Sequence, residues 1–285
     1  MTTRTTTFRW EDELPTYTDC QPKVPGADVI YRPSGEAGEY APLATNPYKG
    51  CGHACVYCYV PNATHVKRPI FDAGAIPRED FEHRLKKDIE RYRRAGICDG
   101  HPAEQVFITF SSDPYHPGDV APTIRTIEIL QEGGLAFCTL SKGGSKALDH
   151  LPLYRPDRDA YAATLTSLDD RFSRKFERNA ALPDDRIRTL LAFHQAGIFT
   201  WVSLEPTLSA EASLAIVDRT YPFVDLYKVG KANYIKTPEP IDWRDYTLRM
   251  IDKLTALGKR HYIKKDLQPF LPEGYANALR VPQHY

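Results

Sequence analysis

The feature that most constrains the fold is a regular alternation of short strand patterns with longer helical patterns, which begins at about residue 42. The strand patterns are apolar or β-branched runs between turn residues, at 43–48, 106–110, 135–140, 161–166, 199–204, 225–229 and 261–264. The helical patterns carry apolar residues at helical spacing, at 79–95, 121–132, 184–196, 210–219 and 242–257. Repeated strand–helix units predict a parallel sheet with helices outside it. Their number fits an α/β fold of the partial (β/α)6, TIM-like barrel type.

The chain has 285 residues, of which 42% are hydrophobic, so it has room for one such barrel with short additions. Residues 1–41 are polar, and we interpret them as an N-terminal extension that wraps the core. Residues 42–270 would form the barrel and residues 271–285 a C-terminal tail. The formal net charge is zero, so global charge does not favour nucleic acid. We find neither a secretory signal pattern nor an apolar run of about 18 residues, and expect a cytoplasmic protein without a membrane partner.

Three cysteines stand close together at Cys51, Cys55 and Cys58, with the spacing C-x3-C-x2-C and no fourth cysteine nearby. Four thiolates would close a zinc site or saturate a four-iron cluster. Three thiolates leave one iron of a cubane cluster without a protein ligand, where a small molecule can bind. The alternative is zinc, with His53 or His65 as the fourth ligand.

In a barrel of this kind the chemistry lies on the loops after the strands. Polar residues follow most of the predicted strands, and the three cysteines follow the first one, so we expect all of them on the same rim. The three cysteines define what we call the cysteine loop, residues 51–58. The candidates outside it are Ser112, Asp113, Lys142, Thr164, Glu205, Lys228, Lys231, Asn233 and the segment 264–266.

The cysteine spacing, with the aromatic Tyr57 directly before the last cysteine, resembles the signature of the radical S-adenosylmethionine (SAM) superfamily. Four stretches resemble more narrowly its spore photoproduct lyase-like branch, often labelled DNA repair photolyase: 40–60, 111–117, 139–144 and 164–167. The resemblance implies that Cys51, Cys55 and Cys58 hold a four-iron, four-sulfur (4Fe–4S) cluster. It also implies that SAM chelates the free iron.

The resemblance further implies a set of SAM contacts. Tyr57 would pack near the adenine, and Ser112 with Asp113 would hold the amino group. Lys142 would pair with the carboxylate, and Thr164 would lie near the ribose or the carboxylate. A zwitterionic amino acid needs one anion and one cation close by, which agrees with this assignment. The alternative is that Asp113 begins a turn and that Lys142 is a solvated loop lysine.

One position departs from the branch. In spore photoproduct lyase a cysteine just before the Ser–Asp pair returns a hydrogen atom to the substrate radical, and Phe110 or Ser111 stands at that position here. Neither can act as a thiol donor, which puts repair of thymine dimers in doubt. Cys138 on the next strand is a candidate donor if its side chain points inward, and packing in the core is its other interpretation.

Four further rim residues are candidates for catalysis. Glu205 follows the fifth strand, and Lys228, Lys231 and Asn233 lie at or after the sixth. A carboxylate opposite lysines in a closed site could bind a polar substrate or assist a proton transfer. The alternative is an ion pair at the rim without a catalytic part.

A basic stripe lies on the predicted helix at 79–95 and consists of Arg84, Lys87, Arg91 and Arg94. These side chains could follow the phosphates of a nucleic acid. Acidic residues are interspersed among them, which favours a solvated helix surface with ion pairs between neighbouring turns.

The resemblance implies an enzyme in which the cluster cleaves SAM to methionine and a 5′-deoxyadenosyl radical. That radical would abstract a hydrogen atom from a nucleic-acid base or nucleotide, in lesion repair or base modification. The expected partners are a reductant such as flavodoxin or ferredoxin and a DNA or nucleotide substrate. Two alternatives stay open: a radical SAM enzyme acting on a peptide or small metabolite, and a non-enzymatic zinc-binding module.

Overall fold

The computed structural model describes residues 26, 28–94 and 105–275. Seven parallel strands form one sheet in the order β1-β4-β5-β6-β7-β8-β9. Their bounds are β1 Leu43–Thr45, β4 Val106–Ile108, β5 Phe137–Ser141, β6 Ala160–Thr164, β7 Phe199–Leu204, β8 Leu226–Val229 and β9 Arg260–Ile263. Each strand lies beside the next one of the sheet in chain order, as repeated strand–helix units require, so the predicted parallel architecture is confirmed.

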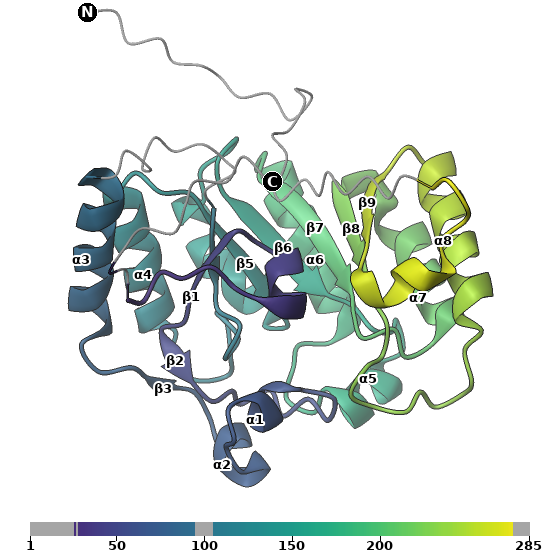
Figure 1. Ribbon diagram of the computed structural model, residues 1–285, viewed down its shortest axis with the longest axis horizontal. Helices are drawn as coiled ribbons and strands as arrows, with labels where there is room; N and C mark the ends of the chain where they lie inside the picture. The colour runs from purple at the N-terminus through teal and green to yellow at the C-terminus, as the bar shows by residue number, and fades with distance from the viewer. Residues whose placement is uncertain (1–25, 27, 95–104, 276–285) are drawn as a thin grey trace, which may run out of the picture.

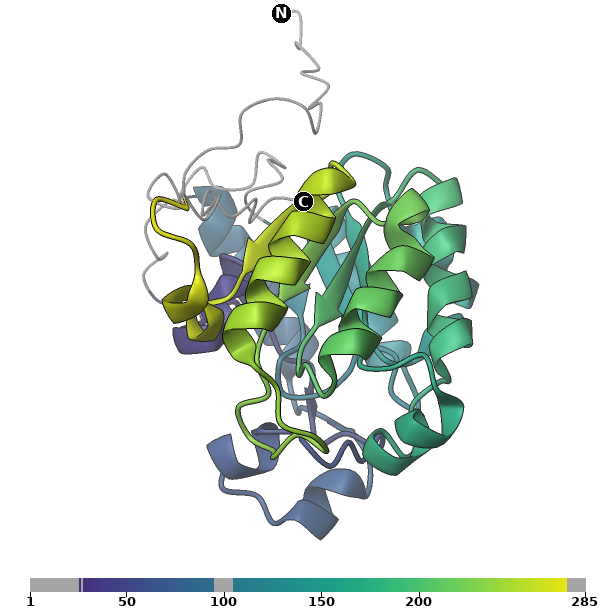
Figure 2. The ribbon, with the colours of Figure 1, turned by 90° about the vertical axis from the view of Figure 1, so that its right-hand side faces the viewer.

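Along the chain, helical segments alternate with the strands of the sheet. In space, the longer helices pack on the outer side of the sheet, as Figures 1 and 2 show. The longer ones are α3 Phe81–Arg94, α4 Ala121–Glu132, α6 Pro183–Gln195, α7 Ala210–Thr220 and α8 Trp243–Ala256. The remaining elements are α1 Val60–Ala63, α2 Arg68–Asp72, α5 Asp170–Phe176, β2 Tyr48–Lys49, β3 Ile76–Pro77 and the 3-10 segments Gly35–Glu39, Gly144–Leu153, Tyr221–Phe223 and Lys265–Phe270. In the described part of the chain, no helix has the length and apolar character of a membrane span.

Four predicted strands, at 43–48, 106–110, 161–166 and 261–264, end earlier in the structure than their sequence patterns suggest, and Asn46 explains the first two. The pattern 43–48 divides because β1 ends at Thr45 and β2 begins a separate antiparallel pair with β3. The Asn46 side chain then reaches the neighbouring strand, where its Oδ1 accepts the backbone N–H groups of Phe110 and Ser111 at 2.8 and 3.1 Å. These two residues therefore leave the sheet, and β4 ends at Ile108 instead of residue 110.

The two faces of the sheet carry different side chains, because neighbouring residues of a strand point to opposite sides. Along β6, Tyr161 and Ala163 belong to the large apolar cluster shared with the helices. Ala160 and Ala162 belong to a separate inner cluster with Trp201. Small alanines on the inner face leave space inside the curved sheet, and the cavity described below lies toward one end of that space.

The end of the N-terminal segment spans the side of the barrel between the first and last strands. Asp88 of α3 accepts three backbone N–H groups from residues 28–30 at 2.6 to 2.9 Å, which fixes the start of this segment. Farther along, Glu39 accepts the Tyr262 hydroxyl of β9 at 2.8 Å. Tyr40 packs in the inner cluster. The 3-10 turn Gly35–Glu39, dark purple in Figure 1, lies in front of the sheet. These contacts agree with an extension that wraps the core, while residues 1–25 and 27 lie outside the described residues.

The basic stripe on α3 carries ion pairs within the chain. Arg84 pairs with Asp28 at 2.6 Å, Arg91 with Asp88 at 3.0 Å, and Arg94 with Glu90 at 3.5 Å. These contacts agree with the solvated-helix interpretation, because carboxylates of the chain itself already neutralise these arginines.

Candidate functional site

One cavity of about 560 Å³ opens among the loops that follow the strands. It brings together most of the predicted site residues: Cys51, Cys55, Tyr57, Cys58, Ser112, Asp113, Lys142, Thr164, Glu205, Lys231, Asn233 and Lys264. Four of the candidates, Cys138, Lys228, Lys265 and Asp266, do not line it. The residues that line it come from loops and strand ends far apart in the sequence. The expectation of a common rim at the carboxyl ends of the strands is therefore confirmed.

The cysteine loop is fixed on both flanks by backbone contacts. At its start, Gly50 has a φ of 82°, and a Cβ there would lie 2.3 Å from the Gly74 carbonyl oxygen, so only glycine fits. The Cys51 N–H donates to the Phe71 carbonyl of α2 at 2.9 Å. In the middle of the loop, the Val56 N–H donates to the carbonyl of Phe176 in α5 at 2.9 Å. The loop is thus held in place between α2 and α5.

The three thiols are free and border the same cavity. Burial raises the pKa of each, in the case of Cys55 to about 12. They stay protonated until a metal displaces the protons, as is usual for thiolate ligands. Within the described ranges, no three His, Cys, Asp or Glu side chains are grouped closely enough to hold one metal ion. In a cluster each thiolate binds a different iron, so thiols spread around a cavity fit it.

Neither predicted fourth ligand for zinc joins the cysteines. The Nε2 atom of His53 faces Asp113 at 3.3 Å. His65 is exposed and has a φ of 54° just after α1. The zinc alternative therefore gains no support from these two residues.

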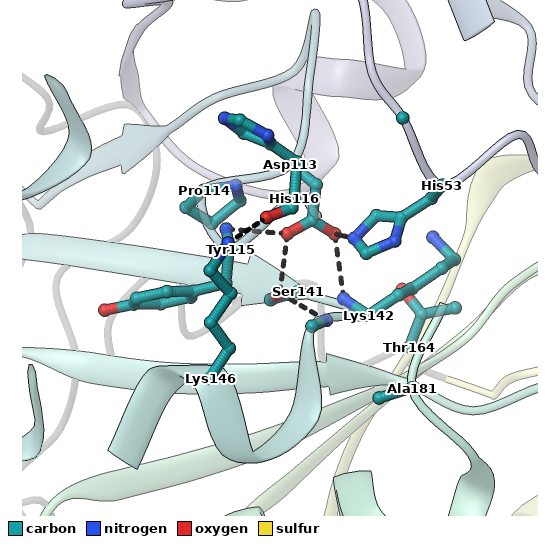
Figure 3. Close-up of polar contacts among 12 residues, drawn as sticks. His53, Asp113, Pro114, Tyr115, His116, Ser141, Lys142, Lys146, Thr164 and Ala181 are labelled. Atoms are coloured by element: carbon teal, nitrogen blue, oxygen red, sulfur yellow. Dashed lines mark hydrogen bonds and ion pairs between the residues drawn. The ribbon is translucent and has the colours of Figure 1, made fainter. Parts of the chain in front are cut away.

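Asp113 connects the cysteine loop to the loops after β4 and β5 (Figure 3). Its Oδ1 accepts the Ser141 hydroxyl at 2.6 Å and the Tyr115 N–H at 2.9 Å. Its Oδ2 accepts the Lys142 N–H at 2.8 Å and faces His53. The bond to Tyr115 is the predicted turn, so Asp113 does begin a turn, and both of its oxygens are used inside the protein.

The surroundings of Asp113 keep it ionised. Burial by itself raises the pKa of a carboxyl group, but His53, Lys142 and the Ser141 hydroxyl together hold the pKa of Asp113 below its usual range. A permanently charged carboxylate at this point favours a positive group in the adjoining part of the cavity.

A second buried pair, Glu177 with Arg186, fixes Tyr57 and was not found from the sequence. Tyr57 donates its hydroxyl hydrogen to Glu177 Oε1. Glu177 Oε2 accepts from the Arg186 guanidinium at 2.6 Å, and both side chains are 1% exposed. Arg186 also donates to the carbonyl of Thr164 at 2.9 Å. Burial raises the pKa of Glu177, but Arg186 and Lys142 lower it by more than burial raises it, so the net shift is downward.

Two groups that line the cavity have unused capacity for bonding. The Lys142 ammonium lies 5.7 Å from the centre of the Tyr57 ring. In the described part of the chain, no carboxylate lies within ion-pair distance of it. The hydroxyl of Ser112 is buried and has no hydrogen-bond partner among the described residues. A cation and a hydroxyl beside three thiols fit the amino-acid end of SAM next to a cluster.

Arg68 of α2 holds the cysteine loop from outside the cavity. Its guanidinium donates to the carbonyl oxygens of Cys55, of Val56 at 3.4 Å and of Cys58 at 3.3 Å. Asp72 orients it through a bond of 2.8 Å. The sequence shows Arg68 only as a surface arginine, because its acceptors are backbone atoms.

Replacing Arg68 with glutamine should loosen the cysteine loop in the iron-free protein. We expect amide hydrogens of residues 51–58 to exchange roughly tenfold faster, because three carbonyls lose a cationic donor. Hydrogen-exchange mass spectrometry measures this. Asp72→Asn, which keeps the guanidinium, should change the exchange much less. Equal exchange in Arg68→Gln and the wild type would show that Arg68 does not hold the loop.

At the other end of the cavity, Glu205 forms a cluster with Tyr40 and Lys264. Tyr40 donates its hydroxyl hydrogen to Glu205 Oε2, and the Lys264 ammonium lies 2.5 Å from the same oxygen. The rings of Phe107 and Phe110 stack beside them, with centroids 4.2 Å apart. Tyr40 was missed as a site residue, because its partner Glu205 lies 165 positions away.

Cys138 and Lys228 lie on the inner side of the sheet but do not line the cavity. The Cys138 sulfur accepts the Trp201 indole N–H at 3.3 Å, in the inner apolar cluster. This position agrees with core packing. Lys228 is fully buried and donates to the carbonyls of Glu39 and Tyr40 at 3.3 and 2.8 Å, so it anchors the N-terminal segment.

Lys228 should make stability depend on pH. Burial lowers its pKa to about 7, so the folded chain binds fewer protons than the unfolded chain between about pH 7 and about pH 10.4. The free energy of unfolding should therefore rise with pH through this window, and Lys228→Met should remove that rise. Denaturant titrations across the window measure it, with the exposed Lys87→Met as a control. An unchanged pH dependence in Lys228→Met would refute the assignment.

Lys231 and Asn233 lie toward the mouth of the cavity. The Lys231 ammonium lies 5.2 Å from the centre of the Trp243 ring. Asn233 is exposed, and its side-chain amide donates to Asp266 at 2.6 Å. These positions suit contacts with an outer part of a ligand better than contacts near the cysteines.

The sequence model of the radical SAM superfamily matches residues 45–208, which is more than half of the chain and includes the three cysteines. The chain has no match among the curated proteins.

Solved structures share the fold. The structure of Streptococcus suis SuiB bound to S-adenosylmethionine has a TM-score of 0.59 and 14% identity, over 81% of this chain and 49% of that chain. This chain thus spans about half the length of SuiB. Spore photoproduct lyase complexed with a dinucleoside spore photoproduct has a TM-score of 0.60 and 12% identity, over 84% of this chain and 79% of that chain. At these identities the likeness is one of fold.

Proposed function

The chain belongs to the radical SAM superfamily, and we propose that it removes a hydrogen atom from a nucleic-acid base or nucleotide, in lesion repair or base modification. The proposal rests on one observation: the same cavity of about 560 Å³ is lined both by the three thiols and by the stacked rings of Phe107 and Phe110. A volume of this order suits a cofactor and a substrate group together.

The residues at the thiol end would hold the two cofactors that the superfamily implies. Cys51, Cys55 and Cys58 would bind a 4Fe–4S cluster, and Lys142 would pair with the carboxylate of SAM. When bound and reduced, the cluster with SAM supplies methionine and a 5′-deoxyadenosyl radical. The protein positions these groups and keeps water away from them. Radical SAM enzymes need a reductant, for which we propose a carrier such as flavodoxin or ferredoxin.

Asp113 acts here through its neighbours. Because its oxygens accept hydrogen bonds from Ser141, Tyr115 and Lys142, it holds the loop that carries Lys142 against the cysteine loop. Its charge lies close to where the ammonium group of SAM would sit and would favour that group without a direct bond. The geometry thus supports a positioning part for Asp113, and the buried hydroxyl of Ser112 is left for the direct contact.

The aromatic end supports a flat substrate group. Phe107 and Phe110 stack with an interplanar angle of 13°, and Tyr40 lies edge-on to Phe110 at 6.1 Å. Base–aromatic stacking is worth about 1–3 kcal/mol per base in proteins that bind single strands. A peptide or small metabolite remains the second candidate, since the fold is shared with SuiB, which has been solved bound to its precursor peptide SuiA.

Deuterium transfer decides between these substrate classes. Reconstituted protein would be incubated anaerobically with SAM, dithionite and deuterated nucleosides or oligonucleotides, and in parallel with deuterated peptides. We expect deuterium to appear in 5′-deoxyadenosine from the nucleic-acid substrates. Transfer from the peptides alone would refute the substrate class while leaving the superfamily assignment intact.

A further inference from the structure

The end of the cavity opposite the cysteines has a chemical character that narrows the substrate. This substrate end is formed by side chains from the N-terminal segment and from strand ends: Tyr40, Phe107, Phe110, Leu140, Ser203, Glu205 and Lys264. The identity of a ligand at this end rests on the proposed function, in which SAM occupies the end with the cysteines.

The charges of the substrate end disfavour an anion. The ammonium of Lys264 lies 2.5 Å from Glu205 Oε2 and 3.8 Å from Glu39 Oε2. The side chains of Lys264 and Glu205 are only 2% and 15% exposed. A phosphate or carboxylate placed here would meet the Glu205 carboxylate, and the nearby Lys264 already lies close to the carboxylates of Glu205 and of the buried Glu39. The group that enters should therefore be uncharged.

One oxygen of Glu205 is available as an acceptor. Its Oε2 accepts from both Tyr40 and Lys264, whereas Oε1 accepts no hydrogen bond from the described residues. Gly230 leaves room for this carboxylate, since a Cβ there would lie 2.8 Å from Glu205 Cδ. A carboxylate oxygen that borders the cavity without a protein partner can accept an N–H donor of the ligand.

The walls of the substrate end are flat and apolar. The Phe110 ring lines the cavity with its back to Phe107, and Leu140 lines it from the next strand. Planar rings pack against such a wall in an offset stack. An aliphatic amide could also donate an N–H, but it would leave the aromatic surface less well covered.

We propose that the substrate end takes an uncharged nucleobase, with the ring against Phe110 and an N–H of its edge donated to Glu205 Oε1. Lys264 beside it offers a donor to a neighbouring carbonyl or ring nitrogen of the same edge. The sugar and phosphate then point to the mouth, where Lys231 and Asn233 lie. Tyr40 serves as a positioning residue, because its hydroxyl fixes the Glu205 carboxylate from the N-terminal segment.

Binding of each nucleoside, compared with binding of its N-methyl derivative, tests this assignment. The probes are the four 2′-deoxynucleosides and, for each one that binds, the derivative methylated at its N–H. Equilibrium dialysis uses the reconstituted holoenzyme loaded with SAM. We expect at least one nucleoside to bind about tenfold more tightly than its N-methyl derivative, because methylation removes the donor to a charged acceptor.

Variants at Glu205 show whether this carboxylate accepts the hydrogen bond from the N–H of the nucleobase. Glu205→Gln should reduce the discrimination between the paired probes severalfold, because a neutral acceptor makes a weaker bond than a carboxylate. Glu205→Met, which has no carbonyl or carboxylate oxygen, should remove it, and where that variant does not fold Glu205→Gln still decides. Glu211→Gln, at the exposed ion pair with Arg249, is the matched control and should discriminate as the wild type does.

The ratio of the two affinities separates recognition from a structural defect, which would weaken both probes alike. Failure of every deoxynucleoside to bind, or equal discrimination by Glu205→Gln and the wild type, would overturn the inference. Its failure is distinguishable from that of the proposed function. If the holoenzyme cleaves SAM but binds a nucleoside and its N-methyl derivative equally well, only the inference is refuted. If the protein binds no cluster and cleaves no SAM, the proposed function is refuted, regardless of the affinities for nucleosides.

Discussion

Replacing Cys55 with alanine is expected to abolish binding of the iron–sulfur cluster and, with it, reductive cleavage of SAM. Cys55 is held firmly in the loop, because the neighbouring Val56 N–H donates to the Phe176 carbonyl and Arg68 donates to the Cys55 carbonyl. Two remaining thiolates cannot hold a cubane whose fourth iron must stay open. Iron and sulfide analysis after anaerobic reconstitution measures the loss directly, before any turnover is attempted.

The matched control for Cys55 is Cys138→Ala. Both thiols are buried, and burial raises the pKa of each to about 12, but Cys138 lies in the inner cluster and does not line the cavity. Cys138→Ala should therefore keep the iron content of the wild type. A Cys55→Ala protein that still holds about four irons per chain would show that the cysteine loop is not the cluster site.

Replacing Arg186 with methionine should be the most destabilising of the charge substitutions discussed here. Arg186 and Glu177 are each 1% exposed and lie 2.6 Å apart. Removing one partner leaves the other charge buried without compensation, which costs about 3–5 kcal/mol. Chemical denaturation measures the loss. The double variant Glu177→Leu/Arg186→Met should recover much of this stability, because two apolar side chains can replace a buried pair.

Recovered stability should not restore the site, because Tyr57 loses its acceptor in the double variant. We expect the double variant to fold but to bind SAM more weakly than the wild type. Arg249→Met, in an exposed pair with Glu211, is the control and should leave the denaturation midpoint unchanged. If Arg186→Met behaved like this surface variant, the buried pair would not hold the site together.

The order of strands and helices was predictable because each element has a local pattern. Strands β7 and β8 are short apolar runs, and α8 is capped by Asp242, whose side chain accepts two N–H groups of the first turn. The same holds for the cysteine loop, where three cysteines lie within eight residues. The rule that parallel strands present their following loops at one edge then placed the remaining candidates.

What the sequence could not predict are pairings between distant segments. The early end of β4 depends on Asn46, which lies 64 positions before Phe110. The anchoring of Tyr57 depends on Glu177, which lies 120 positions after it. In each case a side chain bonds to a residue that only the folded chain brings near. The residue types alone, an asparagine in a loop or a glutamate after a helix, fit many other arrangements.

The same reason explains why Lys228 and Cys138 were predicted as catalytic residues although neither lines the cavity. Both side chains point to the inner face of the sheet, as the alternation along their strands predicts. There they contact Trp201 in the packed interior and do not reach the cavity. Depth along a strand cannot be read from periodicity, because the inner positions of one strand share the same pattern whether they reach the cavity or the packed core.

Formation of 5′-deoxyadenosine shows directly whether this chain cleaves SAM with a reduced cluster. Protein reconstituted anaerobically with iron and sulfide would be mixed with SAM and dithionite, and the products analysed by liquid chromatography with mass spectrometry. We expect 5′-deoxyadenosine and methionine in equal amounts from the wild type and none from Cys55→Ala. Wild-type protein that holds an intact 4Fe–4S cluster and yet releases no 5′-deoxyadenosine would contradict the proposed function.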